Sequence, residues 1–200
     1  MKGSLIIVGF FVLGCIVGVY NILPFNISET DISFYALCAL MFSVGLSIGN
    51  DPQTIKNFRA LNPRLVFLPV MTILGTLAGA AVASLILTHR TTAECMAVGS
   101  GFGYYSLSSI FITEYKGAEL GTIALLSNIS REIITLLAAP LLVRWFGNLA
   151  PISSGGATTM DTTLPIITRC SGQEFVVVSI FHGFVVDFSV PFLVTFFCSL

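Results

Sequence analysis

The residues best suited to chemistry lie in one short stretch of an otherwise apolar chain, residues 155–165, which reads Gly-Gly-Ala-Thr-Thr-Met-Asp-Thr-Thr-Leu-Pro. Adjacent glycines and a proline disfavour a continuous helix here. At the centre is a carboxylate, Asp161. An acid at bilayer depth is costly, so it usually faces protein or water and serves a function. The stretch predicts a substrate site in a transporter; the alternative is a loop outside the membrane with a solvated aspartate.

A second polar group, Asn128, Arg131 and Glu132, interrupts another apolar run. On a helix these three side chains and Thr135 share one broad face. Arg131 and Glu132 point about 100° apart, so each reaches a facing helix rather than the other. One interpretation is that Asp161 pairs with Arg131 when the site is empty, and that Glu132 or Asp161 binds a cationic substrate or a proton. The other is a purely structural salt bridge between helices.

A third feature is a glycine- and serine-rich stretch, residues 99–109. Glycines at 99, 101 and 103 each weaken a helix by about 1 kcal/mol relative to alanine, which predicts an unwound point. A broken helix offers N–H groups at one half and C=O groups at the other, as an amino acid zwitterion requires. Gly101, Gly103, Tyr104 and Ser106 are therefore candidate contacts. Close helix packing through small residues is the alternative explanation.

His182 lies in the last apolar run and is either an interhelical hydrogen-bonding residue or a proton carrier. The chain has only two histidines, and its five cysteines are scattered without metal-ligand spacing. We therefore expect neither a metal site nor a cofactor. The free cysteines fit a role as small apolar packing residues.

The composition identifies an integral membrane protein. Of its 200 residues 55% are hydrophobic and only 10% are charged, and the mean hydropathy is +0.94. A soluble domain carries about a quarter of charged residues. The formal net charge of −1 offers no basic face for nucleic acid. We expect one membrane transporter domain over residues 1–200, with the lipid bilayer as its surroundings.

The apolar runs predict an all-α polytopic fold with about six transmembrane helices and a short broken or re-entrant element. The spans are residues 5–23, 32–48, 65–87, 93–113, 120–145 and 174–197. Discontinuous helices are expected around residues 99–103 and 155–165. The first run is long enough to span, so we interpret it as a retained helix rather than a signal peptide. The basic loop with Lys56, Arg59 and Arg64 predicts cytoplasmic termini.

Four motifs in order and spacing resemble those of the bacterial lysine exporter (LysO) family. They are residues 101–108 (Gly-Phe-Gly-Tyr-Tyr-Ser-Leu-Ser), Asn128 with Arg131-Glu132, Gly156-Ala157-Thr158-Thr159-Met160-Asp161 with Thr163-Leu164-Pro165, and His182-Gly183-Phe184. The resemblance implies export of lysine and toxic lysine analogues across the bacterial inner membrane, with reliance on intramembrane acids. Asp161 falls on one of these acids.

Full-length members of that family carry a further N-terminal hydrophobic region with a second important acid. The resemblance therefore implies either a small companion membrane protein that supplies this region or a divergent half-protein. The candidate substrate- or proton-binding residues are Asp161, Glu132, Arg131, Asn128, Gly101, Gly103, Tyr104, Ser106, Gly156, Thr159 and His182.

The expected function is secondary export of lysine, with Asp161 alternating between a proton and the substrate cation. One alternative is an antiporter that exchanges Na⁺ or another cation for protons, since the same acid and carbonyls suit Na⁺. Another is a non-transporting subunit of a split transporter. An intramembrane aspartyl protease would need two facing acids such as Asp161 and Asp187, but the chain has no Gly-x-Gly-Asp arrangement. We therefore do not expect an enzyme.

Overall fold

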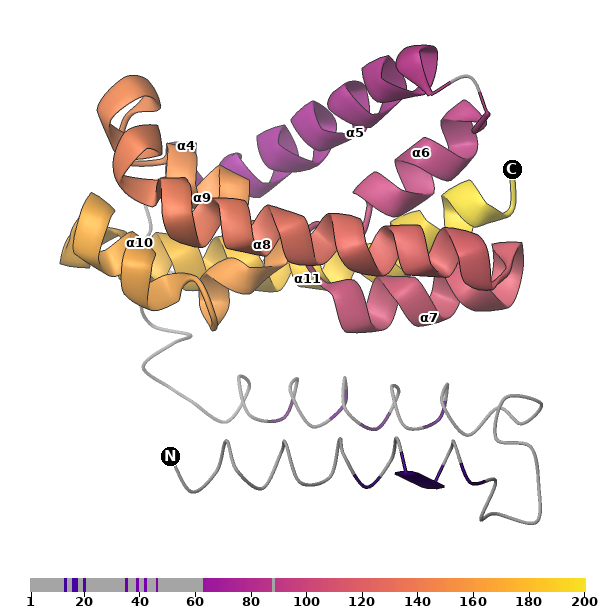
Figure 1. The fold of residues 1–200 in the computed structure, drawn as a ribbon. Coiled ribbons are helices and arrows are strands. Elements are labelled where there is room, and N and C mark those ends of the chain that lie inside the picture. Colours follow the sequence, from indigo (N-terminus) through magenta and orange to yellow (C-terminus); the bar gives the residue numbers. More distant parts are fainter. Residues whose placement is uncertain are drawn as a thin grey trace. The chain divides into compact units, whose positions relative to one another are not determined.

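The structure, a computed structural model, describes residues 63–87 and 89–200 and eight earlier positions, 13, 16, 17, 20, 35, 39, 42 and 46 (Figure 1). Apart from these positions, the predicted spans at residues 5–23 and 32–48 lie outside the described residues, as do Lys56 and Arg59 of the basic loop. The chain forms two compact units, Met1–Leu46 and Ser47–Leu200. The second unit contains every element labelled in Figure 1.

The described residues of the second unit form helices and contain no strand. In chain order the elements are α4 (Pro63–Val66), α5 (Leu68–Ile86), α6 (Thr92–Gly99), α7 (Tyr105–Lys116), α8 (Ala118–Phe146), α9 (Ala150–Gly155), η2 (Gly156–Met160), α10 (Leu164–Ser171), η3 (Gln173–Phe175) and α11 (Val176–Cys198). The predicted all-helical fold is confirmed for this part of the chain.

Three helical segments in the described ranges are long and apolar enough to cross a membrane: Leu68–Ile86, Ala118–Phe146 and Gln173–Cys198. They coincide with the predicted spans at residues 65–87, 120–145 and 174–197. The longest, α8, begins after Gly117 and ends before Gly147, both with positive φ, which an L side chain rarely adopts. The total of six spans and the re-entrant topology stay predictions.

Both predicted interruptions are present. The predicted span at residues 93–113 divides into α6, which ends at Gly99, and α7, which begins at Tyr105. Between them Phe102 and Gly103 have φ values of 46° and 93°. The second interruption separates α9 from α10 through the short 3₁₀ helix η2, and Gly156 at its start has a φ of 64°. A positive φ lies outside the right-handed helical region, so the helix cannot continue through these residues. Each break is therefore a turn of the backbone at these residues.

The long helices α8 and α11 hold these broken segments in place. In Figure 1 α5 and α6 slope away from α8 and meet at the turn that joins them, whereas α7 runs along the α8–α11 pair. An apolar cluster of Ile152, Ile167 and Val178 joins α9, α10 and α11 near one end. Many of the fully buried side chains around the two breaks are polar instead, namely Ser100, Ser108, Thr135, Thr159, Thr163 and His182. A polar interior of this kind requires a complete hydrogen-bond network.

Candidate functional site

The two broken helices meet backbone to backbone. The amide N–H of Ala157 donates to the carbonyl oxygen of Phe102 over 2.9 Å. A Cβ atom at Gly156 would overlap that oxygen, and one at Gly103 would lie 3.1 Å from the carbonyl oxygen of Gly155. Glycine is therefore required on both sides of this crossing, because any side chain would separate the two backbones.

The carbonyls freed by the first break are used within the protein. Those of Gly99, Gly101 and Gly103 accept backbone hydrogen bonds from Phe102, Tyr104 and Tyr105 respectively. The carbonyl of Phe102 accepts from Ala157, as described above. Of the two interpretations of this stretch, close packing accounts for Gly101 and Gly103, whereas a contact between these glycines and a substrate stays a prediction.

Asn128 of α8 replaces the hydrogen bonds that the first break removes. Its Oδ1 accepts from the N–H of Gly103 over 2.7 Å, and its Nδ2 donates to the carbonyls of Ala124 and Val98 over 2.9 and 3.3 Å. The side chain is buried, and a Cβ atom at Gly101 would overlap its amide. A buried amide that satisfies the broken backbone in this way holds the turn in one conformation.

Asn128→Leu, which keeps the side-chain volume, is expected to destabilise the protein by about 1–3 kcal/mol, because the N–H of Gly103 would lose its buried acceptor. Thermal unfolding of the purified protein in detergent measures this loss. Ser130→Ala is the matched control, since among the described residues that exposed hydroxyl bonds only the carbonyl of Leu126 in its own helix. Equal melting temperatures for the two variants would contradict the proposed role of Asn128.

Arg131 binds the C-terminal end of α9. Its Nε donates to the carbonyl of Ser154 over 2.8 Å and its Nη2 to that of Ser153 over 3.0 Å. Its Nη1 lies 3.3 Å from Thr76 Oγ1 on α5, and the guanidinium carbon lies 5.9 Å from the centre of the Phe102 ring. The last carbonyls of a helix lack intrahelical donors and carry partial negative charge, so a cation is favoured there.

The predicted ion pair between Arg131 and Asp161 is not formed. Among the described residues the structure has one ion pair, Arg90 with Glu119. The physical reason is that the Arg131 guanidinium is directed toward the carbonyls of α9, which are closer partners than a carboxylate on the next segment. The cation thus holds the second break in place.

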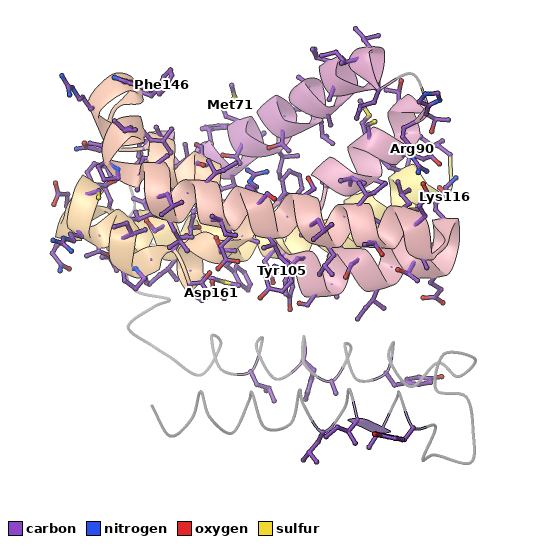
Figure 2. The ribbon with its side chains drawn as sticks, in the orientation of Figure 1. Met71, Arg90, Tyr105, Lys116, Phe146 and Asp161 are labelled. Atoms are coloured by element: carbon purple, nitrogen blue, oxygen red, sulfur yellow. The ribbon has the colours of Figure 1, made fainter. Side chains whose placement is uncertain are left out.

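Asp161 follows η2 and is exposed (Figure 2). Its Oδ1 accepts from the backbone N–H and the hydroxyl of the adjacent Thr162. In the described part of the chain no cation pairs with it. The carboxylate therefore keeps acceptor capacity for an ammonium group or a proton.

Asp187 on α11 is a second acid at this place, and sequence reasoning left it out of the candidate site. The residue is 5% exposed. Gly183, one helical turn earlier, packs so closely on η2 that a Cβ atom there would lie 2.7 Å from the backbone nitrogen of Met160. Residues i and i+4 share a helix face, which brings Asp187 toward Asp161. The sequence signal that could have identified Asp187 was its spacing of four residues from Gly183, which puts both on one helix face.

His182 is completely buried and bonded at both ring nitrogens. Nε2 lies 2.9 Å from Thr72 Oγ1 on α5, and Nδ1 lies 3.2 Å from Thr159 Oγ1 on η2. Thr159 also approaches the carbonyl of Ser179 at 2.9 Å. Among the described residues this arrangement corresponds to the interhelical hydrogen-bonding interpretation, because the ring joins three elements.

The other predicted residues lie around this network. Tyr104 is half-buried at the end of the first break, and Ser106 is exposed in the first turn of α7. Glu132 is half-buried on α8 and forms no ion pair with the described residues. The structure therefore brings Asn128, Arg131, Thr159 and His182 together as supports of the two breaks and presents Asp161 beside them.

Comparisons with known proteins agree with one another. A family model described as "Lysine exporter LysO" matches residues 8–198. "Lysine exporter LysO" of Escherichia coli (strain K12) is 36% identical over 196 residues, which cover 98% of this chain and 64% of that protein. A "Putative lysine exporter" of Haemophilus influenzae is 35% identical over 167 residues, which cover 84% of each chain. The chain thus spans less than two thirds of the Escherichia coli relative. No solved structure matches it.

Proposed function

The chain belongs to the lysine exporter LysO family, and on that basis we propose that it exports lysine and lysine analogues across the bacterial inner membrane as a secondary transporter. The family is one of transporters, which removes the intramembrane protease from consideration. The chain spans 64% of the Escherichia coli relative. The proposal includes a small companion membrane protein that acts together with this chain.

The observation that carries the proposal is Asp161 beside the crossing of two broken helices. Discontinuous helices that meet near one another form the substrate and ion sites of many secondary transporters. Here Asn128 forms hydrogen bonds with the backbone of the first break, and Arg131 with the backbone before the second. The carboxylate of Asp161 forms no ion pair with a cationic side chain among the described residues. An ammonium group of lysine is a natural counter-ion for that carboxylate.

The position of the buried Asp187 near Asp161 supports the proposed coupling to protons. Asp187 is buried on the helix face that packs against η2, and a buried carboxylate is costly when it is ionised and no cation is near it. Either a proton or a substrate ammonium relieves that cost, so the two would exclude each other. This mutual exclusion is the chemical basis of an exchange of lysine for protons.

The test is expression in a bacterium that lacks its own lysine exporters, followed by growth with a toxic lysine analogue. We expect the chain, alone or with a small hydrophobic protein encoded next to it, to raise the tolerated concentration. Resistance only with the companion would support the split transporter. No resistance in either case, with the protein present in the membrane, would contradict lysine export.

Proteoliposomes test the coupling separately. Lysine transport is expected to follow an imposed pH gradient and to stop when a protonophore collapses it. Transport that ignores the gradient would contradict the proton exchange but not the export. Competition by Na⁺ against lysine would instead favour the cation antiporter.

A further inference from the structure

The second unit contains a cavity that the proposed site at Asp161 does not use. The cavity has a volume of about 340 Å³ and lies between α5, α6 and α8. Its wall consists largely of small and apolar residues, Gly79, Ala80, Ala83, Val98, Leu120 and Ile123. In Figure 2 Arg90, which lies at one end of this cavity, is far from Asp161. The cavity is therefore a separate place in the fold.

The inner end of the cavity is formed by Arg131. A guanidinium has five N–H donors. Three hydrogen bonds, to Ser154, Ser153 and Thr76, hold it in place. Two donors thus have no partner within the described ranges. A guanidinium held rigidly with free donors is well suited to a carboxylate, which matches its planar geometry.

The outer end contains an acid, Glu94. Its Oε2 accepts from the N–H of Thr91 over 2.9 Å in the capping box that starts α6, and its Oε1 has no partner among the described residues. Arg90 also lines this end, but it is paired with Glu119 outside the cavity. The charge that remains at the outer end is therefore negative, opposite to that at the inner end.

The two charged ends are separated by a distance that can be read along α6. Gly99 lies at the level of Arg131, because a Cβ atom there would be 3.7 Å from Cγ2 of Thr76, the residue that Arg131 contacts. The Glu94 carboxylate is hydrogen-bonded to the N–H of Thr91, eight residues before Gly99 on the same helix, which corresponds to about 12 Å of helical rise. An extended lysine with one hydrogen bond at each end spans a comparable distance.

We propose that this cavity is a second lysine-binding site, with the α-carboxylate on Arg131, the methylene groups along Ala80, Ala83 and Val98, and the side-chain ammonium on Glu94. The choice of lysine rests on the proposed function. The charges select a molecule with a carboxylate at one end and an ammonium at the other. A diamine or a simple aliphatic carboxylate matches only one end, and a lipid acyl chain matches neither.

A native cysteine reports occupancy of this site, since Cys95 lines the cavity next to Glu94. The protein is prepared with Cys95 as its only cysteine, reconstituted in liposomes and labelled with a maleimide. We expect lysine to slow labelling about tenfold when nine-tenths of the sites are filled, because only empty cavities react. A six-carbon carboxylate and a five-carbon diamine at the same concentration should leave the rate unchanged. The control is a single cysteine introduced as Leu85→Cys, at a position 79% exposed on α5, whose labelling should ignore lysine.

Glu94→Gln tests the acid without removing the helix cap, because the amide oxygen can still accept from Thr91. Loss of a charge-assisted contact is expected to raise the lysine concentration needed for protection about tenfold or more. Glu114→Gln is the matched control, since Glu114 is exposed on α7 and is not among the cavity residues. It should change protection little.

The outcomes separate this inference from the proposed function. If the protein exports lysine but lysine never slows labelling of Cys95, the second site is overturned and export stands. If lysine protects Cys95 but no export occurs, the second site stands and the proposed function falls. Protection by the carboxylate equal to that by lysine would overturn the inference, because the cavity would then not select for an ammonium group.

Discussion

Asp161→Asn is expected to reduce lysine export about 10- to 100-fold while the protein stays folded, because a charged hydrogen-bonded contact contributes about 1.5–3 kcal/mol to binding. The carboxylate is exposed and accepts hydrogen bonds only from Thr162 among the described residues. Asparagine keeps an oxygen acceptor for those bonds and removes the charge that binds an ammonium group or a proton. Initial rates of lysine efflux from loaded cells measure the effect.

Two variants make this result specific. Asp161→Glu keeps the charge and should retain part of the transport. Glu114→Gln removes an exposed acid at the end of α7, away from both breaks, and should leave transport unchanged. Wild-type efflux from Asp161→Asn, with equal protein in the membrane, would rule out this carboxylate as the substrate partner.

The second large effect is expected from Gly156→Ala. Gly156 has a φ of 64°, and a Cβ atom there would overlap the carbonyl oxygen of Phe102 and lie 3.1 Å from its carbonyl carbon. Alanine must therefore separate the two breaks and weaken the hydrogen bond from Ala157 to Phe102. Backbone strain and the lost contact together are expected to cost about 3 kcal/mol or more. The measurement is the unfolding midpoint in detergent, together with the amount of protein in the membrane.

Alanine substitutions at two other glycines separate the effect of backbone strain from the effect of the lost contact between the two breaks. Gly147 has a φ of 86°, but a Cβ atom there would meet no other described atom within 4 Å, so Gly147→Ala should cost only about 1–2 kcal/mol of backbone strain. Gly75 is in the interior of α5 with equally open space, and Gly75→Ala should be neutral or stabilising. If Gly156→Ala were no worse than Gly147→Ala, the close crossing of the breaks would not be essential.

Much of the fold follows from local composition. The apolar lengths predict α5, α8 and α11, and the glycines at 99, 101, 103, 155 and 156 predict where helices must end. These features depend on a few consecutive residues, since backbone freedom and hydrophobic length are local properties. The same reasoning also identified Asn128, Arg131 and Asp161 as unusual, because polar residues in apolar runs are costly.

The partners of these residues were less predictable. The sequence predicted a cation at Arg131 but paired it with the wrong group, and it related Asp187 to Asp161 only in the protease alternative, not as part of the transport site. Among side chains, charge complementarity favours Asp161 as the partner of Arg131. The backbone carbonyls at the end of α9 compete for the same cation. Every residue has such a carbonyl, so the pattern of side-chain types does not show which carbonyls are free to accept.

The sequence by itself determined the resemblance to the LysO family, the positions of the three long apolar helices α5, α8 and α11, and the two places where the helical structure breaks. Only the tertiary structure decided that the breaks touch through Phe102 and Ala157, that Arg131 caps α9, and that Arg131 and Glu94 face one cavity from its two ends. The physical reason is range. Helix formation and breakage follow from neighbouring residues, whereas the partner of a buried charge is chosen among groups such as Thr76 and Arg131, which are 55 residues apart in the chain and meet only in the folded protein.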